Sequence, residues 1–198
     1  MNNRTFFSII AILAIFISVS QTSCSGSLPW GKNLAKTQCK KDSEMSGTFR
    51  AHASAESERE SFAKDKAITL ARNELAGNIA TGISSTINIF NSEVSGDGLT
   101  TLEQQDILGF VSEIVKGSRV MCTETYYRKK PKDKGALIYT VEVCVEISEA
   151  SISQLYNQVQ SRNYLKVQKT QSDFLNRTRE EFERYRDDRG IDRDATGF

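Results

Sequence analysis

The longest periodic pattern in the chain is helical. Apolar residues recur every three or four positions from residue 63 to residue 90, which puts them on one face of an α-helix. Alanines make up much of the first half of this face, so that half can approach a sheet closely. The positions are Ala63, Ala67, Leu70, Ala71, Leu75, Ile79, Ile83, Ile87 and Phe90. The pattern predicts one long amphipathic helix, ended by the glycine-containing segment 91–100.

A second helix is predicted directly after that segment. Thr100 or Thr101 stands three residues before Glu103 or Gln104, the spacing of a capping box at a helix start. Gly117 follows the last apolar position and is typical of a helix end. The apolar positions between them are Ile107, Leu108, Val111, Ile114 and Val115.

Three segments alternate between apolar and polar residues, which is typical of half-buried strands. They are residues 48–55, 119–129 and 136–148, and the polar segment 130–135 between the last two predicts a β-hairpin. In the return strand, Tyr139, Val141, Val143, Val145 and Ile147 are expected to face the core. Thr140, Glu142, Cys144 and Glu146 alternate with them and are expected to face outward.

These elements predict an α+β fold in which a long amphipathic helix and a second helix pack on a small antiparallel sheet. We assign this domain to residues 47–148 and expect a charge-rich, helical C-terminal extension over residues 149–198. An apolar stripe begins the extension, with Ile152, Leu155, Tyr156 and Val159. Residues 177–194 are so highly charged that they predict either an exposed helix with many ion pairs or a disordered tail.

The N-terminus has the order of a signal peptide, which we assign to residues 1–23. Arg4 precedes an apolar run from Phe6 to Val19, and small polar residues follow. About 14 residues are too few to cross a bilayer permanently, because a spanning helix needs about 20.

Two cleavage sites compete at the end of this signal. Cleavage after Ser20 by an ordinary signal peptidase would release a soluble periplasmic protein beginning at Gln21. The segment from Gln21 to Cys24 instead resembles a lipobox, although Gln21 stands where an aliphatic residue is usual. We favour a lipid on Cys24 that anchors the chain to a membrane, with residues 24–46 as a flexible tether and linker. A Ser after the lipidated Cys favours the outer membrane, by resemblance to Gram-negative sorting signals.

Charge and residue chemistry argue against several functions. The chain has 26 basic and 25 acidic residues, so it has no basic excess of the kind that binds nucleic acid. The one histidine, His52, is expected on the polar side of a strand, with no nucleophile or orienting group around it. We therefore expect no catalytic residue, no metal site and no cofactor.

The cysteines point to a disulfide. If Cys24 is lipidated, then Cys39, Cys122 and Cys144 remain, an odd number for an oxidising compartment. A hairpin centred near Asp133 places Cys122 opposite Cys144, which predicts a cross-strand disulfide. The alternative is two free thiols, since a two-residue slip in register would separate them. Cys39 would then be unpaired or joined to a partner chain.

Three stretches resemble the LPP-twenty lipoprotein family of bacterial envelopes. They are residues 67–76 in the long helix, 115–120 entering the hairpin and 138–143 in its return strand. The resemblance extends over roughly residues 48–148. It implies a small α+β domain with a long helix against an antiparallel sheet, found in lipoproteins and in envelope proteins related to flagellar assembly. It implies no catalytic residues.

Together these patterns lead us to expect a non-enzymatic lipoprotein, anchored in the outer membrane and facing the periplasm or the cell surface. Its role would be structural or a matter of protein contacts, either with other envelope proteins or with a second copy through the C-terminal helix. The alternative is a soluble periplasmic protein that binds a small ligand. That alternative predicts a roomy apolar pocket between the long helix and the sheet.

Overall fold

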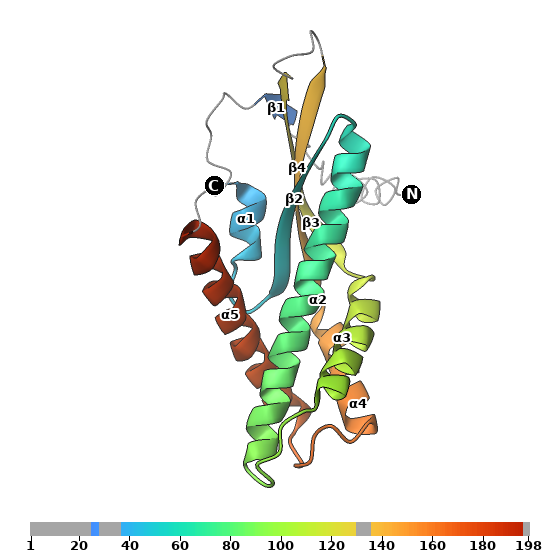
Figure 1. Ribbon diagram of the computed structural model, residues 1–198, viewed down its shortest axis with the longest axis vertical. Coiled ribbons are helices and arrows are strands. Elements are labelled where there is room, and N and C mark those ends of the chain that lie inside the picture. Colours follow the sequence, from blue (N-terminus) through green and yellow to red (C-terminus); the bar gives the residue numbers. More distant parts are fainter. Residues whose placement is uncertain (1–24, 28–36, 130–135, 196–198) are drawn as a thin grey trace, which may run out of the picture.

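The computed structural model describes residues 25–27, 37–129 and 136–195 (Figure 1). The predicted signal peptide and Cys24 lie outside the described residues. The elements, in chain order, are β1 (Ser25–Ser27), α1 (Gln38–Ser43), β2 (Phe49–Ser57), α2 (Glu60–Ser92), α3 (Thr101–Val115), β3 (Arg119–Lys129), β4 (Leu137–Ile147), α4 (Glu149–Ser161) and α5 (Gln171–Ala195).

The strands form one sheet in the order β1-β3-β4-β2. β3 and β4 make the predicted hairpin, and β2 pairs antiparallel with the other side of β4. β1 adds to the free edge of β3 in parallel, with Ser25 opposite Thr125. The predicted α+β class is therefore confirmed. The strand after Cys24 was not predicted, because Ser25–Ser27 was expected to belong to a flexible tether.

The long helix α2 packs along one face of this sheet, as the alanine pattern predicted (Figure 1). Ala63, Ala67 and Ala71 are fully buried, and they belong to the same core as Val143 of β4. Alanine has no side chain beyond Cβ, so the helix axis can approach the strands closely. Leu70 is an exception to the predicted stripe, because 41% of its surface stays exposed.

The second helix and the hairpin also follow the sequence pattern. Thr100 caps α3, and the carboxylate of Glu103 accepts a hydrogen bond of 2.7 Å from the Thr100 backbone N–H, completing the predicted capping box. The β3–β4 register places Cys122 opposite Cys144, as expected. On β4 the expected core positions Val141, Val143 and Val145 are fully buried.

The C-terminal half of the chain shares this core. Phe174 and Phe182 of α5 are fully buried, and the Phe182 ring meets the ring of Phe49 on β2 edge-on at 5.1 Å. Asn91, at the end of α2, fixes the connection between α4 and α5 by donating to Tyr164 O at 2.9 Å and accepting from Lys166 N–H at 2.8 Å. The predicted boundary at residue 148 therefore does not separate two structural units. The charged segment is a helix whose apolar side is covered by α2.

A buried carboxylate fixes α5 against α2. Glu181 accepts a hydrogen bond of 2.7 Å from the Ser85 hydroxyl and pairs with Arg177 at 3.0 Å. Burial opposes the charge, but the Ser85 hydroxyl, Arg184 and Arg177 together lower the pKa of Glu181 below its ordinary value. The polar side of α5 therefore contributes to packing as well as to solubility. None of the helices within the described residues has the length and apolar character needed to cross a membrane.

Two glycines of α2 test how closely α5 approaches. A methyl group on Gly82 would lie 3.2 Å from Phe182 N and 3.3 Å from Thr178 O, both backbone atoms, whereas one on Gly77 would meet nothing within 4 Å. Gly77→Ala should stabilise the fold by about 0.5–1 kcal/mol through helix propensity. Gly82→Ala should lose that gain because α5 must move away. Urea unfolding of both variants measures the difference, and equal gains would contradict such close packing.

Candidate functional site

The second face of the sheet was expected to be exposed, but the structure covers it. Helix α1 lies on this face, which we call the α1 face, and makes contact with β2, β3 and β4. Glu142 and Cys144 on β4, predicted to face outward, are fully buried there. The prediction of a loose linker up to residue 46 is therefore wrong for α1. Helix α1 has six residues and no apolar periodicity, so the sequence contains too little pattern to predict it.

A disulfide fixes α1 to the sheet. Cys39 of α1 is bonded to Cys122 of β3, with Cα atoms 5.3 Å apart, and Cys144 is a free, buried thiol. The predicted Cys122–Cys144 disulfide is thus contradicted, although its register was right. The expectation that Cys39 is unpaired or joined to a partner chain is wrong for the same reason. Helix α1 lies across β2, β3 and β4 and brings the Cys39 sulfur onto Cys122, which can form one disulfide at a time.

Buried polar side chains lie beneath α1. Glu142 Oε2 is 3.1 Å from His52 Nε2, and Glu142 Oε1 has no hydrogen-bond partner among the described residues. Glu124 stands opposite Glu142 in the register, and one of its oxygens accepts the Cys39 N–H at 3.1 Å. His52 is therefore a partner of a buried carboxylate rather than an ordinary surface histidine. This pairing was not predicted, because the helix that covers it was not predicted.

The ionisable side chains on the α1 face have a structural role. Burial, the neighbouring Glu124 carboxylate and its hydrogen bond raise the pKa of Tyr126 to about 12. Burial likewise raises the pKa of the Cys144 thiol to about 12, so it is not an activated nucleophile. Cys39, Cys122 and Glu124 place ligand atoms within 4.8 Å of one another, but the two sulfurs are bonded to each other and offer no thiolate to a metal.

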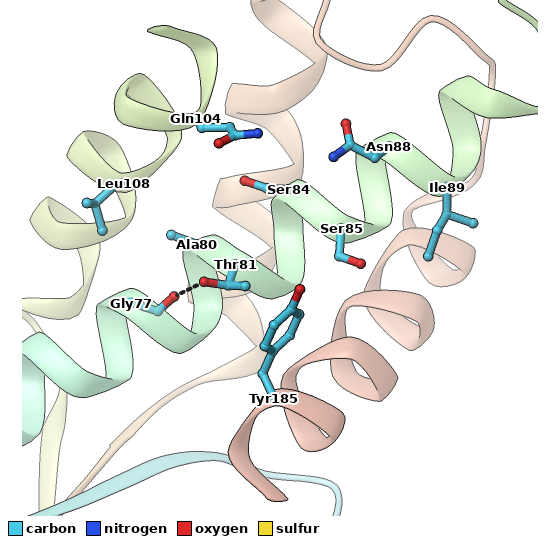
Figure 2. Close-up of a pocket in the computed structure, with 10 residues that line it drawn as sticks. All are labelled: Gly77, Ala80, Thr81, Ser84, Ser85, Asn88, Ile89, Gln104, Leu108 and Tyr185. Atoms are coloured by element: carbon cyan, nitrogen blue, oxygen red, sulfur yellow. Dashed lines mark hydrogen bonds between the residues drawn. The ribbon is translucent and has the colours of Figure 1, made fainter. Parts of the chain in front are cut away.

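A groove lies between α3 and α5, on the side of α2 that faces away from the sheet (Figure 2). We call it the α2 groove, and it has a volume of about 430 Å³. Figure 2 shows α2 as its floor, with Gln104 and Leu108 of α3 on one side and Tyr185 of α5 on the other. The floor residues are Gly77, Ala80, Thr81, Ser84, Ser85, Asn88 and Ile89.

The lining gives the groove a definite chemical character. Its side chains are small, hydroxyl, amide or apolar, and none of them is charged, a histidine or a cysteine. Several polar groups already hold the walls together, since Asn88 Oδ1 accepts the Leu99 N–H at 2.7 Å and Ser85 donates to Glu181. Leu108 lines the groove and keeps 44% of its surface exposed. The groove therefore offers shape, apolar contact and hydrogen bonds, with no group that ionises near neutral pH.

The position of this groove differs from the expected one. The small-ligand alternative required a pocket between the long helix and the sheet, but the residues there form the buried core of Ala63, Ala67, Ala71 and the facing strands. The hollow lies instead on the outer side of the same helix, because small residues also occupy the positions between the core residues. Nothing in the spacing of these positions showed that α3 and α5 would stand on either side of them.

A comparison with models of protein families finds none that matches the chain, and a comparison with curated proteins finds no match either.

The disulfide can be tested by its effect on stability. Cross-linking residues 83 positions apart should stabilise the folded state by about 2–4 kcal/mol, chiefly by restricting the unfolded chain. A reductant should therefore lower the urea midpoint of the native protein. Cys122→Ala serves as the matched control, because its midpoint should already be low and should not change with reductant. A native midpoint that does not respond to complete reduction would contradict the assignment.

Proposed function

We propose that this chain is an exported protein of the bacterial cell envelope, held at the outer membrane by a lipid on Cys24, that binds another envelope protein. The Cys39–Cys122 disulfide carries the first part of the proposal. Disulfides that staple a fold persist in oxidising compartments and are rare in the reducing cytosol. The disulfide therefore supports export, which the signal-like N-terminus independently predicts.

The α2 groove is the surface through which we propose that it binds. Its floor of small residues lets a backbone approach closely, and helices α3 and α5 form its walls. We propose an amphipathic helix of a partner as its occupant, with the apolar side of that helix on Leu108 and Ile89. The C-terminal helix is a less suitable surface for self-association, since Phe174 and Phe182 are buried against the core.

The proposed role is not enzymatic. The groove lining lacks the combination of nucleophile, base and orienting group that catalysis needs. The polar groups beneath α1 are covered by a helix that the disulfide holds in place. The resemblance of residues 48–148 to LPP-twenty lipoproteins implies no catalytic residues, which agrees with this proposal.

A second candidate, small-ligand binding, is favoured by the volume of the groove. About 430 Å³ falls within the range of pockets that bind small molecules. The groove is open along one side, however, and it has no charged group to orient a polar ligand. We therefore place this candidate second.

The anchor is tested by the intact mass of the protein from the membrane fraction of its host. We expect a chain beginning at Cys24 with a diacylglyceryl group and an amide-linked acyl chain, because a thiol directly after a small residue ends the signal. Globomycin, which blocks lipoprotein signal cleavage, should abolish this species. Cys24→Ser serves as the matched control. An unmodified chain beginning at Gln21 would contradict the anchor and favour the soluble alternative.

The groove is tested by photocrosslinking in living cells. A crosslinking amino acid at Gln104 should capture one defined partner, whereas the same amino acid at Lys66, exposed on α2 away from the groove, should not. Ser84→Trp fills the groove and should abolish capture from position 104 without lowering the urea midpoint. Capture that survives Ser84→Trp would contradict the proposal. A small molecule retained in native mass spectra, and lost in Ser84→Trp, would support the second candidate instead.

A further inference from the structure

Three cysteines come together on the α1 face, and two of them are bonded. Cys39 of α1 and Cys122 of β3 form the disulfide, and Cys144 of β4 is the free cysteine among the described residues. Cys144 is fully buried and stands directly opposite Cys122 in the β3–β4 ladder. Cys122 therefore has two neighbouring cysteines, Cys39 on α1 and Cys144 on β4.

The ladder places Cys144 at a distance suitable for bonding. Directly opposed residues of an antiparallel pair have Cα atoms about 4.5–5.5 Å apart. A disulfide accepts Cα separations of about 4.4–6.8 Å. The present Cys39–Cys122 separation of 5.3 Å falls in the same range. A bond from Cys122 to Cys144 would therefore need no change in strand register.

We propose that Cys122 can exchange its disulfide partner, from Cys39 to Cys144. In this step the Cys144 thiol loses its proton and the thiolate attacks the Cys122 sulfur. The bond between Cys122 and Cys39 breaks, and its electron pair leaves on Cys39, which takes up a proton. One disulfide and one thiol are present before and after the step. The exchange therefore needs no external oxidant or reductant.

Helix α1 restrains this exchange. The Cys39 N–H donates a hydrogen bond of 3.1 Å to the Glu124 carboxylate, and Arg50 Nη1 donates one of 3.1 Å to Asp42 O. Both hydrogen bonds support the disulfide that joins α1 to Cys122. Burial keeps the pKa of Cys144 high, while the charges of Arg50, Asp42 and Glu146 act on it in opposite directions. Attack by a protonated, covered thiol is slow. The exchange should therefore proceed when the hydrogen bonds around α1 open and water reaches Cys144, while the disulfide still holds the helix.

The exchange would change what holds α1. With Cys122 joined to Cys144, α1 keeps only weak polar contacts to the rest of the fold, such as Arg186 Nη1 to Ser43 O at 3.3 Å. Release of α1 would uncover Glu142 and His52. The exchange does not depend on the proposed anchor.

Peptide mapping of the protein as purified from its host tests the exchange directly. Trypsin cuts after Lys and Arg, so Cys39, Cys122 and Cys144 fall in three peptides, 37–40, 120–128 and 135–162. The protein is incubated without added thiol at about pH 9, where more thiol ionises, then alkylated and digested without reduction. We expect the 120–128 peptide linked to 135–162 to rise several-fold during incubation, with alkylated 37–40 rising in step. A map in which 37–40 stays linked to 120–128 overturns the proposal.

Two variants complete the test. Cys144→Ser removes the attacking thiol, so its 37–40 peptide should remain linked to 120–128 throughout the incubation. Cys39→Ser leaves Cys122 and Cys144 alone together, and oxidised glutathione should join them. If a folded Cys39→Ser protein instead keeps both thiols open to alkylation, the ladder does not permit the bond and the proposal is wrong. If Cys39→Ser does not fold, the native map decides. None of these readouts depends on the lipid or on the groove, so failure here leaves the proposed function standing.

Discussion

The close contact between α2 and the elements on either side of it determines most of the architecture. Toward the sheet, Ala63, Ala67 and Ala71 bring the helix onto the strands; toward α5, Gly82 brings two helix backbones together. A helix that touches neighbours on two sides cannot shift without opening both contacts, because close-packed interiors accept little displacement. Other small residues, on a third side of α2, form the floor of the α2 groove between α3 and α5.

The opposite face of the sheet is held in a different way. Beneath α1 the contacts are a disulfide, a carboxylate paired with His52 and a backbone N–H on Glu124, with few apolar side chains. Burying Glu142 with one oxygen unpartnered costs free energy that apolar packing would not. A covalent link offsets this cost. One face of the sheet is thus covered by the close packing of α2. The other is covered by α1, which is held by a disulfide that can be reduced or exchanged.

The packing of α2 on the first face of the sheet could be predicted from the sequence, but the cover that α1 forms on the second face could not. Regular spacing from Ala63 to Phe90, the capping box at Thr100 and the alternation in β4 each carry a physical period that the fold preserves. Helix α1 is too short to show a period, so Glu142 and His52 looked exposed and Cys144 looked like the partner of Cys122. A C-terminal helix was expected, but the packing of α5 against the core was not, because its buried positions are few and include Glu181. The groove depends on both α3 and α5, so its existence could not be predicted.

The short strand β1 has a consequence for orientation. Ser25 lies opposite Thr125, so the backbone one residue beyond Cys24 is already hydrogen-bonded to the edge of the sheet. A lipid on Cys24 would therefore leave almost no free chain between the acyl groups and the folded protein. Such a protein would be held close to the bilayer at the β1 side of the sheet, and its tilt would be restricted. Its docking would then be a search in two dimensions with the rotational freedom largely removed.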